Sequence, residues 1–143
     1  MLRRSFLIGI LLISIVPAKS LDRAIVTDEE FQHITGHLPK NRNPHSGYEY
    51  QLMTQGSKKL AFIGEHQTDP FRKDARFMLE KFENSWLAYK VNDDSYAIAF
   101  KDVYTRFHND TISRAQADRM CGELLGYTDK QINSFIGRSD GIR

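Results

Sequence analysis

Glu65 and His66 are the pair of residues with the clearest potential for chemistry. They follow Gly64 at the end of a predicted strand and precede Thr68, Asp69 and Pro70, which are typical of a helix start. A carboxylate beside an imidazole could supply a general base and the group that orients it. Neighbouring residues on an extended chain point to opposite faces, however, which disfavours cooperation between them. We therefore take Glu65 and His66 as candidate binding residues and assign no catalytic residue.

The remaining histidines offer weaker patterns. His33 and His37 are four residues apart, a spacing that can place two imidazoles on one helical face for a metal ion. Gly36 should end that helix before His37, and the glutamate that a metallopeptidase motif needs directly after the first histidine is absent. We therefore predict exposed histidines there, with no metal site and no cofactor. His108 is a further candidate binding residue.

Aromatic residues are the other positive signal. Tyrosine and tryptophan suit a recognition surface because they bury large rigid area and keep a polar group, but they suit a small core equally well. Tyr89, in a predicted strand, is our candidate for a binding role among them. Cys121 is the only cysteine, so no intramolecular disulfide can form, and we expect it to be a small buried apolar residue on a helix face; the alternative is an intermolecular disulfide or a reactive thiol.

Residues 1–20 have the pattern of a cleaved export signal. Arg3 and Arg4 precede an apolar run from Phe6 to Val16, and the segment ends in small-x-small residues, Ala18-Lys19-Ser20. The run makes about 16 Å of helix, roughly half the hydrocarbon thickness of a bilayer. Paired arginines also occur in twin-arginine signals, but only two residues precede Arg3, which favours the general export route. We predict a periplasmic or secreted protein that begins near Leu21, without a stable membrane span after cleavage.

The net charge argues against nucleic acid as a partner. The whole chain has 20 basic and 18 acidic residues, a net charge of +2, but Arg3, Arg4 and Lys19 lie in the predicted leader. The 17 remaining basic residues against 18 acidic ones give the mature chain a net charge of −1. Phosphate binding needs a clustered basic excess, whereas charges of both signs alternate here. The rest of the chain is of ordinary size for one domain, which we place at 21–137, followed by a polar tail at 138–143.

Local signals predict most of the secondary structure. Capping boxes at Thr27, Ser113 and Thr128 predict three helices, the last two forming a C-terminal helical pair around Gly126. Residues 48–53 and 59–64 read as two strands joined by a turn at 55–57, and residues 40–47 as a polar loop. A helix is predicted from Pro70, with an apolar stripe through Phe71, Ala75, Met78, Phe82 and Trp86.

Residues 86–107 have two interpretations. With period two, residues 86–91 and 95–100 are strands joined by a turn at Asn92-Asp93-Asp94. With period 3.6, the apolar residues from Tyr96 to Phe107 share one helical face, and Asp94 could cap it. We favour strands, because aromatic and β-branched residues flank a polar turn. The prediction is an α+β fold with a small antiparallel sheet of about four strands, helices on one face and a C-terminal helical pair; the alternative is an all-α bundle.

The functional expectation follows from small size, near-zero charge and the lack of a catalytic signature. We expect an exported, non-enzymatic protein-binding factor, such as an inhibitor, immunity or accessory protein, whose partner is another envelope or secreted protein. The alternative is a small hydrolase or metal-dependent enzyme built around Glu65 and His66, with His108 and Asp110 as further members of the site. Native pull-down, metal analysis and Glu65→Gln discriminate between the two.

Overall fold

Three helices begin where the sequence places a capping box. In the computed structural model, which describes residues 21–141, Ser113 and Gln116 bond reciprocally at the start of α6, and Thr128 and Gln131 do so at the start of α7. At α2 only half of the box forms, since Thr27 accepts from the Glu30 N–H. The helices are α2 (Asp28–Thr35), α3 (Glu49–Gln55), α4 (Asp69–Arg72), α5 (Ser95–His108), α6 (Arg114–Leu124) and α7 (Asp129–Gly141).

The predicted export leader, residues 1–20, lies outside the described residues. Helix α7 continues to Gly141, so residues 138–141 extend the helix at the point where we expected a polar tail to begin. None of the helices in the described range is long and apolar enough to cross a membrane.

The strands form one three-stranded antiparallel sheet in the order β1-β3-β2. The strands are β1 (Ala61–Ile63), β2 (Phe77–Phe82) and β3 (Ser85–Lys90), and Ala88 of β3 pairs with Ala61 on one side and with Leu79 on the other. The α+β class is therefore confirmed, with three strands where we expected about four.

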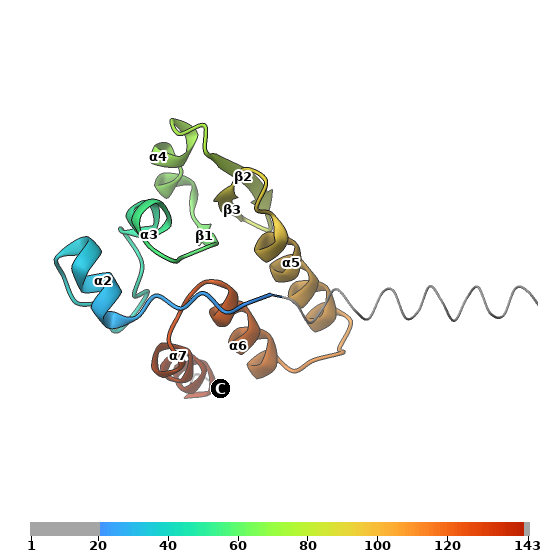
Figure 1. The fold of residues 1–143 in the computed structure, drawn as a ribbon. Coiled ribbons are helices and arrows are strands. Elements are labelled where there is room, and N and C mark those ends of the chain that lie inside the picture. The colour runs from blue at the N-terminus through green and yellow to red at the C-terminus, as the bar shows by residue number, and fades with distance from the viewer. Residues whose placement is uncertain (1–20, 142–143) are drawn as a thin grey trace, which may run out of the picture.

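Helices cover both faces of this sheet, whereas the sequence suggested one. Figure 1 shows α3 and α4 on one side of the strands and α5 on the other. Because side chains alternate along a strand, each face contributes to its own core. The α3–α4 side buries Met53, Ala61, Ile63, Phe71, Phe77 and Ala88. The α5–α6 side buries Leu60, Leu87, Tyr89, Tyr96, Ala97 and Phe100, and packs α6 through Cys121, Leu124 and Leu125.

Of the elements predicted before residue 86, three were wrong: the strand at 48–53, the turn at 55–57 and the long helix from Pro70. The strand predicted at 48–53 lies in helix α3 (Glu49–Gln55) and its N-cap Tyr48, and Gly56 caps the end of the helix, so no hairpin turn exists there. The burial of Glu49, Leu52 and Met53 follows a helical spacing of three and four. The helix predicted from Pro70 stops at Arg72, because the Asp74 carboxylate accepts from the Arg76 N–H and turns the chain into β2.

Residues 86–107 combine the two interpretations. The first part is strand β3, as we favoured, but residues 95–100 belong to helix α5 and not to a strand. Tyr96, Ala97, Phe100 and Val103 are buried at helical spacing against the sheet, which fixes this segment as a helix. The all-α alternative fails because β2 and β3 pair over their full length.

Candidate functional site

A groove of about 390 Å³ lies where α5, α6 and α7 meet. Its floor is aromatic: the ring centroids of Phe62 and Phe100 are 5.0 Å apart, and those of Phe100 and Tyr104 are 5.2 Å apart. Phe135 of α7 stands at its side with 47% of its surface exposed. A concave, mostly apolar surface of this size falls within the range of ligand-binding sites. We take this groove as the candidate functional site.

Polar residues collect at one end of the groove. Arg119 of α6 bonds Asn133 of α7, and Gly122 of α6 faces Ile132 of α7, so the two helices run antiparallel. The first residue of α6, Arg114, and a late residue of α7, Arg138, are therefore directed to the same end of the pair. His108, the last residue of α5, lines the groove with them. We call this the basic end.

The opposite end of the groove is formed by the corner between α6 and α7. Gly126 adopts φ +86°, a left-handed conformation that favours glycine, and its carbonyl accepts from the Val26 N–H at 2.8 Å. The side chain of Arg23 donates to the carbonyl of Tyr127 and pairs with Asp129 at 2.8 Å. The N-terminal segment thus fixes the corner from outside.

Behind this corner lies a buried charge cluster, Lys58–His45–Glu49, whose members are each at most 8% exposed. The Lys58 ammonium donates to the carbonyl of Leu125 and lies 2.9 Å from Nδ1 of His45. It also forms an ion pair with Glu49, 3.2 Å from Oε2, although the geometry of this contact is not that of a hydrogen bond. It also lies 5.3 Å from the centroid of the Tyr127 ring. Leu125 and Tyr127 both line the groove, so the cluster supports its inner end.

Burial disfavours every charge in the cluster. It raises the pKa of Glu49 and lowers the pKa of Lys58, while the opposite charge of each partner counteracts the shift in the other. Burial, assisted by the lysine charge, lowers the pKa of His45 to about 2. When Lys58 donates to Nδ1, the imidazole proton lies on Nε2, which has no hydrogen-bond partner. The ring of His45 instead stacks on Phe31 and lies tilted against Tyr127, with centroids 6.1 and 4.5 Å away.

The predicted pair Glu65 and His66 lies away from the groove. Both are exposed, in a 3-10 turn (Glu65–Gln67) after β1. The Glu65 carboxylate accepts from the indole N–H of Trp86 and pairs with Arg72 at 3.2 Å. Arg72 itself lies over the Trp86 ring, 4.9 Å from its centroid. These contacts connect α4 to the central strand, and no hydrogen bond of the described residues joins Glu65 to His66.

The structure does not bring the four predicted binding residues together. Tyr89 is only 8% exposed, packs under α5, and donates from its hydroxyl to Glu80 at 3.0 Å, so it belongs to the core. His108 alone lines the groove. Sequence reasoning missed the two arginines that accompany it, Arg114 and Arg138. The capping boxes place Arg114 at the start of α6 and Arg138 near the end of α7, and this was the available signal. To use it, one must also know that the two helices pack antiparallel.

Cys121 also lines the groove on a face of α6, and it is half-buried where we expected a buried apolar residue. Burial, with a smaller contribution from Asp118, raises the pKa of its thiol to about 12. His33 and His37 are exposed, and His37 follows the left-handed Gly36 that ends α2. Among residues 21–141, no group of three or more histidine, cysteine and acidic side chains is arranged to hold a metal ion.

Comparison of the chain with protein-family models, with curated proteins and with solved structures gives no match.

Proposed function

We propose that this chain is an exported, non-enzymatic binding protein, and that it recognises another envelope or secreted protein through the groove between α5, α6 and α7. The observation that carries the proposal is the groove itself, an aromatic floor closed at one end by a braced corner and bordered at the other by basic side chains. Recognition sites in proteins combine a desolvated apolar centre with a polar rim in the same way.

The surroundings of Glu65 support binding over hydrolysis. A general base needs a carboxylate within reach of a substrate proton, with a partner that orients it. The oxygens of Glu65 are instead engaged by Arg72 and Trp86, which connect secondary-structure elements. His108 ends α5 and Asp110 follows it in the next turn, and of these residues only His108 lines the groove, so the residues of the enzymatic alternative do not converge on one cavity.

Phe135 offers a direct test of the groove. Its side chain is 47% exposed and lines the groove, so Phe135→Asp should leave the fold intact and place a carboxylate where an apolar partner must pack. Met78 is 46% exposed on β2 and does not line the groove, which makes Met78→Asp a matched control. Loss of a central aromatic contact at an interface costs about 2 kcal/mol or more, so partner binding should fall at least about tenfold.

The assay is capture of a partner from envelope extract by the immobilised mature protein, with the partner quantified by mass spectrometry. Wild type and Met78→Asp should retain one partner in stoichiometric amount, and Phe135→Asp should lose it while keeping a native circular dichroism spectrum. Equal capture by all three proteins, or no stoichiometric partner, contradicts the proposal. Intact mass analysis tests export separately, because the protein should begin near Leu21; a protein that retains Met1 and is recovered from cytosol removes that part.

A further inference from the structure

The charges around the groove are unequal. Among the side chains that the structure describes, two guanidinium groups, Arg114 and Arg138, and the imidazole of His108 line it, against one carboxylate, that of Asp118. Arg114 lies 3.8 Å from Asp118 in an i,i+4 pair, which offsets part of one positive charge. The basic end therefore keeps a positive excess next to an aromatic floor, although the mature chain as a whole carries a net charge of −1.

Arg138 is held in place by two uncharged acceptors, and no ion pair joins it to a side chain that the structure describes. Its Nη1 donates to Ser134 at 2.7 Å and to the carbonyl of Asn41 at 3.4 Å, and neither acceptor is charged. A guanidinium has donors on three nitrogens, so those on Nε and Nη2 can still bind a carboxylate. Because the side chain is anchored on two elements, little of its freedom is lost when it binds.

We propose that the groove binds an amphipathic helical segment of the partner protein that places large apolar side chains on the aromatic floor and acidic side chains against Arg114 and Arg138. This inference rests on the proposed function and specifies the chemistry of the partner. An amphipathic helix that lies in an apolar groove is a common mode of peptide recognition. The position of the positive charges at one end gives the segment a preferred direction, since its acidic side chains must meet the basic end.

A second copy of this chain is a less suitable occupant. Its most acidic helix, α2, starts with Asp28, Glu29 and Glu30, but the apolar side of α2 is already occupied, because Phe31 is 1% exposed in the protein's own core. Glu30 is also engaged, since its carboxylate accepts from both the N–H and the hydroxyl of Ser57 at 2.7 Å. This helix therefore offers no free apolar face beside its carboxylates.

The test uses three fluorescein-labelled helical peptides of about 15 residues. They share one face of leucine and phenylalanine and differ only in the flanking residues, which are glutamate, glutamine or lysine. We expect the glutamate peptide to bind about tenfold more tightly than the lysine peptide by fluorescence anisotropy in about 0.05 M salt, with a smaller ratio in about 0.5 M salt.

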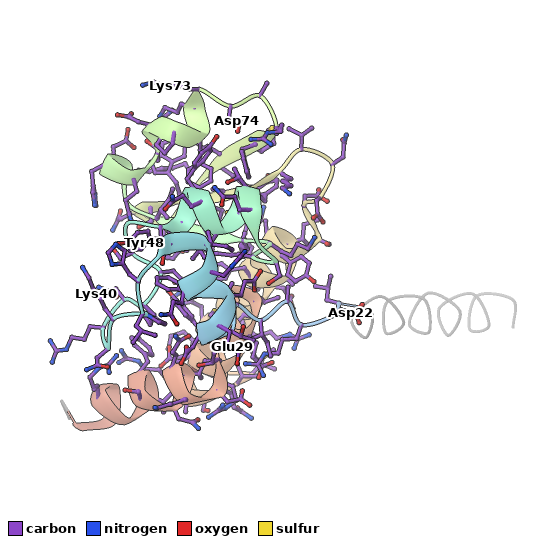
Figure 2. All side chains as sticks on the ribbon, turned by 60° about the vertical axis from the view of Figure 1, so that its left-hand side comes forward. Asp22, Glu29, Lys40, Tyr48, Lys73 and Asp74 are labelled. Atoms are coloured by element: carbon purple, nitrogen blue, oxygen red, sulfur yellow. The ribbon has the colours of Figure 1, made fainter. Side chains whose placement is uncertain are left out.

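Variants assign the preference to the basic end. Arg138→Gln and Arg114→Gln should each reduce the ratio of glutamate-peptide to lysine-peptide affinity by several-fold. Lys73→Gln is the control of equal charge change: Lys73 is exposed and lies at the end of the molecule opposite α7, as Figure 2 shows. Phe135→Asp should abolish binding of all three peptides. Circular dichroism and urea unfolding show whether each variant is folded.

Three results overturn the inference. Equal affinity for the three peptides, or a preference for lysine, removes the acidic partner. Binding of dodecanoate that requires Phe135, without binding of any peptide, assigns the groove to a free amphiphile. A dimer in sedimentation that Phe135→Asp dissociates assigns it to a second copy. The proposed function is judged separately, since capture of the envelope partner can still depend on Phe135 when the peptides show no charge preference.

Discussion

Replacing Lys58 with methionine should destabilise the protein strongly, because Lys58 holds the buried charge cluster together. Its side chain is 0% exposed and contacts Glu49, His45 and the carbonyl of Leu125. Methionine has a similar length but no charge, so the change leaves the Glu49 carboxylate buried without its partner. Breaking a buried pair in this way costs about 3–5 kcal/mol. The total stability of a domain is about 5–15 kcal/mol, so the effect should be large.

The loss should depend on pH in a defined direction. Burial raises the pKa of Glu49, and in the Lys58→Met protein the lysine charge that counteracts this shift is gone. A carboxyl group with a raised pKa in the folded state contributes stability that is fully present below its unfolded pKa of about 4.5 and lost as pH rises through its folded pKa. The deficit relative to wild type should therefore be smallest near pH 4.5 and grow toward pH 7. Adding Glu49→Gln should restore part of the stability at pH 7.

Urea unfolding followed by fluorescence measures these free energies. Trp86 is the single tryptophan, and it lies on β3 in the centre of the sheet, so its emission reports on the folded domain. Lys59→Met is the control, since Lys59 is the adjacent residue and is exposed. Its effect should stay within about 0.5 kcal/mol. If Lys58→Met is no less stable than Lys59→Met, or if its deficit shrinks as pH rises, the description of the cluster is wrong.

Two further predictions concern groups with shifted pKa values. The pKa of His45 is about 2 in the folded protein against about 6.5 in the unfolded chain, so the stability that it contributes is complete above about pH 6.5 and is lost as pH falls. Between pH 6.5 and 4.5, the free energy of unfolding measured in urea should decrease by up to about 1.4 kcal/mol per pH unit. His45→Gln should remove this dependence, and the control His37→Gln should keep it. The Cys121 thiol, with a pKa of about 12, should react with iodoacetamide at pH 8 at least about a hundredfold more slowly in the native protein than in urea, and equal rates would contradict its burial.

Helix starts were predictable because caps are local. The hydroxyls of Ser113 and Thr128 bond a backbone N–H three residues ahead, so the sequence alone contains both partners of the interaction. Glu30 shows the limit of this reasoning, because it fits a capping box by type and spacing but bonds Ser57, which is 27 residues away. Partners that are distant in the sequence leave no local pattern.

The strands were harder to predict for the same reason. Phe71, Ala75, Met78, Phe82 and Trp86 recur at helical spacing, yet the segment divides between α4, β2 and β3. Phe77 and Leu79 face the α3–α4 core only because β2 pairs with β3 in that register. The side chain of Asp74, which ends the helix, was the one local clue. Helix α5 was misassigned because Tyr96, Ala97 and Phe100 fit a buried strand or a buried helix equally well over so few residues.

The groove was beyond sequence reasoning, because its lining comes from segments between Asn43 and Arg138 that only the fold assembles. Of the predicted site residues only His108 reaches it, and it was chosen for its chemistry and not for its position. A histidine or glutamate can be recognised by type, whereas an apolar groove is made of residues that elsewhere form ordinary core. The two arginines come together at its basic end only because α6 and α7 pack antiparallel.

The buried charge cluster and the groove are best understood together. Replacing buried charges by apolar side chains of similar volume is often neutral or stabilising, so Lys58, His45 and Glu49 are a poor means of stabilising a small domain. The cluster instead positions two residues that line the groove, because Lys58 donates to the carbonyl of Leu125 and contacts the ring of Tyr127. A corner bonded by a buried ammonium tolerates fewer alternative packings than one held by methyl groups, because each alternative leaves a buried charge unpaired. The shape of the groove is thus fixed from the N-terminal half of the chain, as the proposed recognition of a specific partner requires.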